Sequence, residues 1–163
     1  MEKVKATEGN KEWKELEAAE DFTTRIYYKG AFMGLDAHVL FQFFDNQLSF
    51  ISITFTEKFH NGDDYMAEYN RIDTSLQTEY GSAKVEKHWS VDTYKDSIDK
   101  WGQALIEGHL DIYTEWKIPY VETPKTLIDH SIGDNDSNII HGIRYFSVDL
   151  STLLEEGKIK NRF

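Results

Sequence analysis

One octapeptide, His109–Trp116 (HLDIYTEW), carries titratable side chains at a spacing that could do chemistry. Successive side chains of a β-strand point to opposite faces, so His109, Asp111, Tyr113 and Glu115 would share one face. An imidazole and two carboxylates are the groups of a metal site or of a general acid/base pair. Neighbours on one strand face lie about 7 Å apart, so a metal would need further ligands from adjacent strands.

His130 and His141 lie in the next two expected strands and could complete such a composite site. The candidate binding set is therefore His109, Asp111, Tyr113, Glu115, His130 and His141. The competing interpretation is a solvent-facing strand surface, because an antiparallel sheet covered on one side produces this alternation without any functional demand. We favour the solvent-facing interpretation and assign no catalytic residue and no metal ligand.

Other catalytic motifs are missing from the sequence. There is no Gly-Xaa-Ser-Xaa-Gly, no His-Glu-Xaa-Xaa-His and no phosphate-binding glycine loop. Asp134–Asn138 resembles the opening of a calcium loop, but Ile139 stands at the glycine position and Tyr145 at the glutamate position. We expect a hairpin turn there, no metal and no cofactor, and we lean against an enzyme.

The net charge of the protein limits the kinds of molecule that we expect it to bind. The 163 residues include 29 acidic and 18 basic side chains, a net charge of −11, which disfavours nucleic acid and anionic lipid. A basic protein partner or a small ligand remains compatible. The chain has no cysteine, and no apolar run long enough for a signal peptide or a membrane span, so as written we expect it to be soluble.

The strongest β signal is a pair of apolar runs, residues 37–44 and 48–55, joined by Asp45-Asn46-Gln47. The two runs predict a hairpin with a three-residue turn. Apolar residues fall on both parities of the second run, which predicts either a bulge near residue 50 or burial on both faces.

The clearest helix is expected over residues 64–80. Asn61 to Asp64 offer capping oxygens, and Gly81 is placed as the C-terminal stop. The apolar stripe on one face consists of Tyr65, Tyr69, Ile72 and Leu76.

The remaining segments complete an α+β fold, an antiparallel sheet packed on one face by one long helix (about 64–80) plus short helices. We expect a polar tail with a short helix (11–19) in residues 1–20, a single domain over 21–150 and a C-terminal tail over 151–163. Further strands are expected at 22–28, 84–89, 109–118, 125–132 and 138–148, with helical segments at 96–102 and 151–156.

The aromatic residues divide by expected burial. We assign Trp89, Trp101 and Trp116 to the core, whereas Tyr27, Tyr113 and Tyr145 are candidates for a less buried face. An aromatic and acidic surface on an open sheet face would suit contact with a protein or a small ligand.

Several short motifs, taken in their order along the sequence, resemble the pattern of a group of known proteins. They are VLFQFFDNQLSFISITF, Leu76–Gly81, Lys87-His88-Trp89, Trp101-Gly102, Gly108-His109-Leu110, Thr114-Glu115-Trp116 and Ile143-Arg144-Tyr145. Over residues 22–150 the chain resembles a loose group of uncharacterised bacterial proteins of exported or lipoprotein type, although Ser82-Ala83 stands where that group usually has a proline. The resemblance implies a β-α-β sheet of the β-lactamase-inhibitor or TATA-binding-protein kind, a binding role, and export if a leader precedes this sequence. It supplies no catalytic residue.

Three functional hypotheses follow. The first is a bacterial, non-enzymatic binding or interaction module that contacts a protein or small ligand through an open sheet face. The second is a small metal-dependent protein or enzyme that uses His109, Asp111 and Glu115. The third is an acidic inhibitor or immunity-type protein that binds a basic partner.

Overall fold

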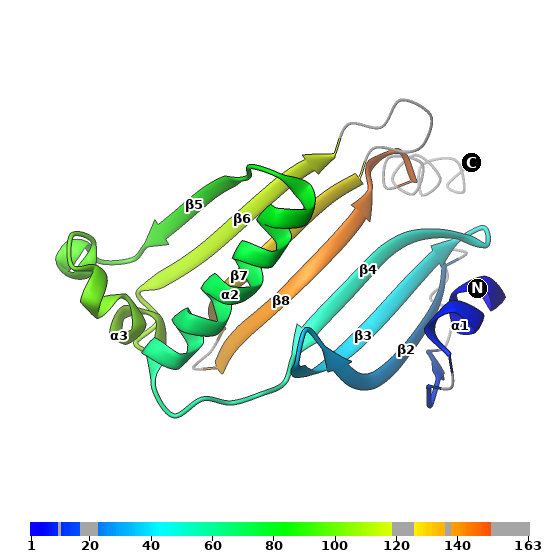
Figure 1. Ribbon diagram of the computed structural model, residues 1–163, viewed down its shortest axis with the longest axis horizontal. Helices are drawn as coiled ribbons and strands as arrows, with labels where there is room; N and C mark the ends of the chain where they lie inside the picture. The colour runs from blue at the N-terminus through cyan, green and yellow to red at the C-terminus, as the bar shows by residue number, and fades with distance from the viewer. Residues whose placement is uncertain (10, 17–22, 119–125, 136–137, 151–163) are drawn as a thin grey trace, which may run out of the picture. The chain divides into compact units, whose positions relative to one another are not determined.

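The computed structural model describes residues 1–9, 11–16, 23–118, 126–135 and 138–150 as an α+β fold (Figure 1). Its eight strands form an antiparallel sheet in the order β1-β2-β3-β4-β8-β7-β6-β5. The predicted combination of an antiparallel sheet and helices is thereby confirmed. The strands are β1 (Lys14–Leu16), β2 (Thr23–Phe32), β3 (Leu35–Phe44), β4 (Gln47–Phe55), β5 (Lys84–Trp89), β6 (Leu110–Ile118), β7 (Thr126–Asn135) and β8 (Asn138–Ser147). The described helices are α1 (Glu2–Glu8), α2 (Gly62–Tyr80) and α3 (Trp101–Ile106), with 3-10 turns η1 (Asp92–Tyr94) and η2 (Ile98–Lys100).

The chain divides into two compact units, each built from separate stretches of sequence. Unit 1 comprises Met1–Ile53, Lys117–Ile128 and Arg144–Phe163, and unit 2 comprises Thr54–Trp116 and Asp129–Ile143. The described helices include none that is long and apolar enough to cross a bilayer.

In unit 1, tight two-residue turns connect β2 to β3 and β3 to β4. Met33 and Gly34 have φ of 51° and 85°, and Asp45 and Asn46 have φ of 46° and 61°. Positive φ at both central residues is what a type I′ hairpin turn requires. The second turn is one residue shorter than predicted, because Gln47 already belongs to β4.

The buried face of β3 and β4 follows a regular alternation. Val39, Phe41 and Phe43 are buried on β3. On β4, Ser49 and Ile53 are buried with half-buried Ile51 between them. Phe50 has the opposite parity and packs against Phe146 with the ring centroids 5.0 Å apart, so the apolar parity change reflects partial burial on the second face.

In unit 2, α2 begins and ends where its sequence signals predict. The Asn61 side chain accepts a hydrogen bond from the Asp64 amide at 2.9 Å, and Gly81 follows the helix with φ of 84°. The helix has 19 residues, an ordinary length, so the expectation of one long helix is not confirmed. The residues that join α2 to α3, β6 and β7 in one core are Tyr65, Tyr69, Ala104, Leu105, Leu110, Ile112 and Ile132.

The N-terminal prediction is wrong. A helix was expected over 11–19, but the structure places α1 at Glu2–Glu8 and a strand at Lys14–Leu16. Leu16 pairs with Arg25 of β2, and the Trp13 ring packs 5.1 Å from that of Tyr28. These long-range contacts outweigh the weak local helix propensity. Residues 17–19 lie outside the described residues.

The other strand predictions hold closely. β5 occupies the predicted residues 84–89, β6 starts one residue after His109, and β7 continues through Gly133 to Asn135. The helical turn expected at 151–156 lies outside the described residues, as does the whole predicted C-terminal tail, 151–163.

Candidate functional site

The predicted alternation of the HLDIYTEW strand is present in β6. Leu110, Ile112, Thr114 and Trp116 are buried, whereas Asp111 is exposed and Tyr113 and Glu115 are half-buried. Asp111 accepts a hydrogen bond from the Asp134 amide at 3.1 Å, and the Tyr113 hydroxyl donates to Glu115 at 3.4 Å.

His109 lies before the strand and has local partners of its own. Its Nδ1 is 2.9 Å from the Ser90 hydroxyl, and its ring stacks against Tyr94 with the centroids 6.0 Å apart. The Tyr94 hydroxyl in turn donates to Glu107 at 2.7 Å. This is a surface hydrogen-bonding arrangement that holds a loop in place, and it does not converge with Asp111 or Glu115 on a metal.

His130 and His141 lie on the other face of the strands, under α2. Both are buried, with exposed fractions of 0% and 3%, and the His130 ring stacks on Tyr69 at 4.2 Å. The composite site suggested by the sequence is therefore not assembled, because these histidines are buried under α2, whereas His109 precedes β6 and contacts Ser90 and Tyr94. Among the described residues, no group of three or more histidine, aspartate or glutamate side chains is arranged to hold a metal.

The two buried histidines belong to a hydrogen-bonded chain that the sequence did not reveal. Their Nε2 atoms are 2.9 Å apart, and His130 Nδ1 is 3.4 Å from Asp73 Oδ1. Gln77 donates to the other oxygen of Asp73 at 2.6 Å. If His130 donates from Nδ1 to Asp73, its Nε2 accepts, and His141 must donate from Nε2.

Burial determines the protonation states of the side chains in this hydrogen-bonded network. Burial, the neighbouring His130 and Arg71 lower the pKa of His141 to about 3. Burial also lowers the pKa of His130, against the opposing effect of Asp73. Burial alone would raise the pKa of Asp73, but hydrogen bonds from His130 and Gln77 outweigh it and lower that pKa. At neutral pH both imidazoles are uncharged and enclosed, and their hydrogen bonds tie α2 to β7 and β8.

One sequence signal could have found Asp73. It follows Ile72 and lies four residues after Tyr69, at the border of the apolar stripe of α2, where a carboxylate needs a buried partner.

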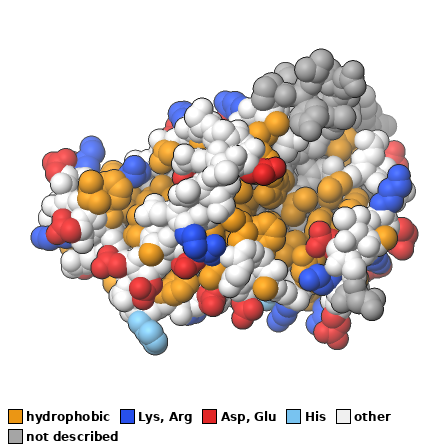
Figure 2. Space-filling view, in the orientation of Figure 1, with side chains coloured by type: hydrophobic (Ala, Val, Ile, Leu, Met, Phe, Trp, Pro, Cys, Tyr) orange, Lys and Arg blue, Asp and Glu red, His pale blue; other side chains and the backbone are white. Residues whose placement is uncertain are grey.

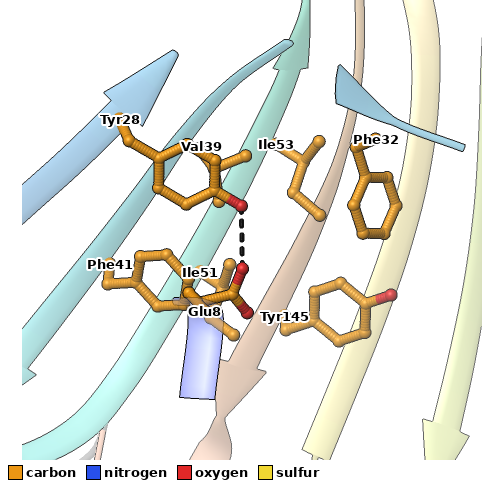
Figure 3. Close-up of a pocket in the computed structure, with 8 residues that line it drawn as sticks. All are labelled: Glu8, Tyr28, Phe32, Val39, Phe41, Ile51, Ile53 and Tyr145. Atoms are coloured by element: carbon orange, nitrogen blue, oxygen red, sulfur yellow. Dashed lines mark hydrogen bonds between the residues drawn. The ribbon is translucent and has the colours of Figure 1, made fainter. Parts of the chain in front are cut away.

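A pocket in unit 1 is the stronger candidate for a functional site (Figure 3). Its volume is about 180 Å³. It is lined by Glu8, Tyr28, Phe32, Val39, Phe41, Ile51, Ile53 and Tyr145. Figure 3 shows the rings and aliphatic side chains around one space, with Glu8 reaching in from α1. Hydrophobic side chains are visible at the surface over β3 and β4 in Figure 2.

One end of the pocket is polar. The Tyr28 hydroxyl donates to Glu8 Oε2 at 2.9 Å. Burial, together with this carboxylate, raises the pKa of Tyr28 to about 12, so the hydroxyl keeps its proton. Lys11 places its ammonium 5.1 Å from the centre of the Tyr28 ring.

A second hollow of about 240 Å³ adjoins this pocket and shares Ile51 and Tyr145 with it. Phe50 and Phe146 are among its lining residues, and it contains no charged side chain. Of the residues singled out in the sequence as less buried aromatics, Tyr145 alone reaches either hollow, and it is half-buried.

No family model, curated protein or solved structure matches this chain.

The pocket can hold an apolar group and orient it by one polar contact. Its lining contains no cysteine, serine, threonine or histidine, and Glu8 is the one carboxylate among the lining residues.

Proposed function

We propose that this protein is a non-enzymatic binding module whose unit 1 pocket accepts a single apolar ring. The observation that carries the proposal is the lining: seven of the eight side chains are aromatic or branched aliphatic, and the eighth is Glu8 at the polar end. Binding sites of this kind combine an apolar wall with one or two polar groups that fix orientation.

The volume sets the size of the bound group. The pocket measures about 180 Å³, and a cavity of about 150 Å³ suffices for benzene. Sites for whole drug-sized ligands are larger, at about 300–1,000 Å³. The pocket therefore fits one ring with a short substituent, either as a free small molecule or as the tip of a side chain.

Binding of an isolated ring can be measured by titrating the isotope-labelled protein with p-cresol and following backbone amide resonances by NMR. We expect saturable shifts concentrated on the residues around Val39, Phe41 and Ile53, with a Kd between about 10 µM and 1 mM for a ligand of this size. Scattered, non-saturating shifts would contradict the proposal.

A matched pair of variants ties the binding to the pocket. Ile51→Trp places a large ring in the pocket and should abolish the shifts. Ile140→Trp makes the same replacement at a side chain that is 46% exposed in unit 2, and it should bind p-cresol like the unaltered protein. If Ile51→Trp does not melt cooperatively, Ile51→Phe provides a smaller block with the same expected direction.

A further inference from the structure

We propose that the pocket selects ligands in which an ammonium group is joined to a single apolar ring, the arylalkylamine class, over neutral and anionic counterparts. This inference rests on the proposed binding function and specifies its ligand chemistry. It is carried by the position and surroundings of one carboxylate, Glu8.

Glu8 is the sole charged side chain among the eight that line the pocket. Tyr28 donates a hydrogen bond to its Oε2, and within the described part of the chain no lysine, arginine or histidine forms an ion pair with it. The carboxylate therefore borders an apolar space without an ion-pair partner among the described residues. A ligand ammonium placed there would supply that charge while its ring fills the pocket.

The helix that carries Glu8 increases its need for a cation. Glu8 is the last residue of α1, where the carbonyl ends of the helix give a partial negative charge. The lysine in the last turn, Lys5, is turned away, since its ammonium bonds to Glu15 at 2.9 Å. Both effects favour a positive group beside Glu8.

The ring of Tyr28 already attracts an ammonium. Lys11 Nζ lies 5.1 Å from its centre, within the range of a cation–π contact. The edge-on contact with Trp13, at 5.1 Å and 79°, holds this ring in place. The net charge of −11 adds a long-range attraction for cations and a repulsion for anions.

The test compares three probes that share a phenyl ring and a two-carbon spacer: 2-phenylethylamine, 2-phenylethanol and 3-phenylpropanoate. Calorimetric or NMR titration at neutral pH and low salt should show the amine binding at least about fivefold more tightly than the alcohol, and the carboxylate more weakly than both. The preference should decrease as salt is added.

Two variants assign the preference to Glu8. Glu8→Gln retains an oxygen that accepts the Tyr28 hydrogen bond but removes the charge, and it should bind the amine and the alcohol equally. Glu2→Gln, on the same helix, makes the same change in net charge outside the pocket and should retain the preference.

The outcomes separate the inference from the proposed function. A preference for the amine that Glu8→Gln abolishes and Glu2→Gln retains supports the inference. Equal binding of all three probes, or a preference that survives in Glu8→Gln, overturns it while leaving a ring-binding pocket in place. Failure of every probe, together with p-cresol, overturns both.

Discussion

The Nε2 atoms of His130 and His141 lie 2.9 Å apart in the core of unit 2. At that separation one ring donates a proton and the other accepts it, so the contact requires that the pair not carry two charges. His130 is held on its other side by Asp73, and its ring is stacked on Tyr69. Acidification therefore acts directly on the attachment of α2 to the sheet.

The first prediction concerns stability and pH. The folded-state pKa of both histidines is lowered, and that of His141 lies at about 3, whereas an unfolded histidine titrates near 6.5. Below pH 6.5 the unfolded chain binds more protons than the folded one, so the free energy of unfolding must fall as pH falls. We expect a loss from His141 that approaches about 1.4 kcal/mol per pH unit below pH 6.5, with His130 acting in the same direction, measured by urea unfolding from pH 7.5 to pH 5.

A control for this prediction replaces an exposed histidine. His60→Gln should retain the pH dependence, whereas His130→Leu combined with His141→Leu should reduce its slope. A stability curve of the unaltered protein that stays flat between pH 7.5 and pH 5 would contradict the assigned role of the pair.

The second prediction concerns Asp73. Asp73→Ala leaves the His130 Nδ1 proton and the Gln77 amide without their shared acceptor, and we expect a loss of about 1–3 kcal/mol in the free energy of unfolding. Asp73→Asn keeps one acceptor oxygen for His130 and should cost less than the alanine variant. Equal stability of Asp73→Ala and the unaltered protein would show that the hydrogen bonds of Asp73 contribute nothing to stability.

The third prediction concerns the contact between the start of α2 and α3. A Cβ added at Gly62 would overlap the backbone carbonyl of Gly102, and a Cβ added at Gly102 would overlap Asp63. Neither backbone can move without displacing a helix, so Gly62→Ala and Gly102→Ala should each destabilise by about 2 kcal/mol or more. Gly30→Ala meets the end of the Tyr28 ring at 3.1 Å and is the milder comparison in thermal unfolding.

The fourth prediction compares two tryptophans. Trp116 is 1% exposed and its Nε1 donates to the Gly81 carbonyl at 3.0 Å, whereas the buried Nε1 of Trp101 has no hydrogen-bond partner among the described residues. Trp116→Phe should therefore destabilise by about 2–3 kcal/mol, and Trp101→Phe by less than about 1 kcal/mol. Chemical denaturation of the two variants checks the order, which a larger loss in Trp101→Phe would reverse.

The parts of the fold that local sequence determines could be predicted. The apolar stripe and the caps at Asn61 and Gly81 define α2, and the alternation in HLDIYTEW defines the buried and solvent faces of β6. The N-terminus could not be predicted, because Lys14–Leu16 becomes a strand only by pairing with Arg25–Tyr27. Pairing between residues that are distant in sequence leaves no periodic signal in either segment.

The pocket in unit 1 could not be predicted from the sequence for the same reason. Glu8 belongs to a segment that we expected to be a polar tail, and its partner Tyr28 is twenty residues away. The six residues proposed from the sequence do not come together. His130 and His141 are buried under α2, whereas Asp111, Tyr113 and Glu115 alternate with the buried residues of β6.

The pocket is assembled from segments that lie far apart in the sequence. Seven of its lining residues lie between Glu8 and Ile53, and Tyr145 follows after 91 intervening residues, most of which form unit 2. A ribosome that has released only the first half of the protein has therefore made no complete binding site. Competence to bind arises only after Tyr145 has been synthesised and β8 has joined the sheet, so ligand binding reports that strands distant in the sequence have come together.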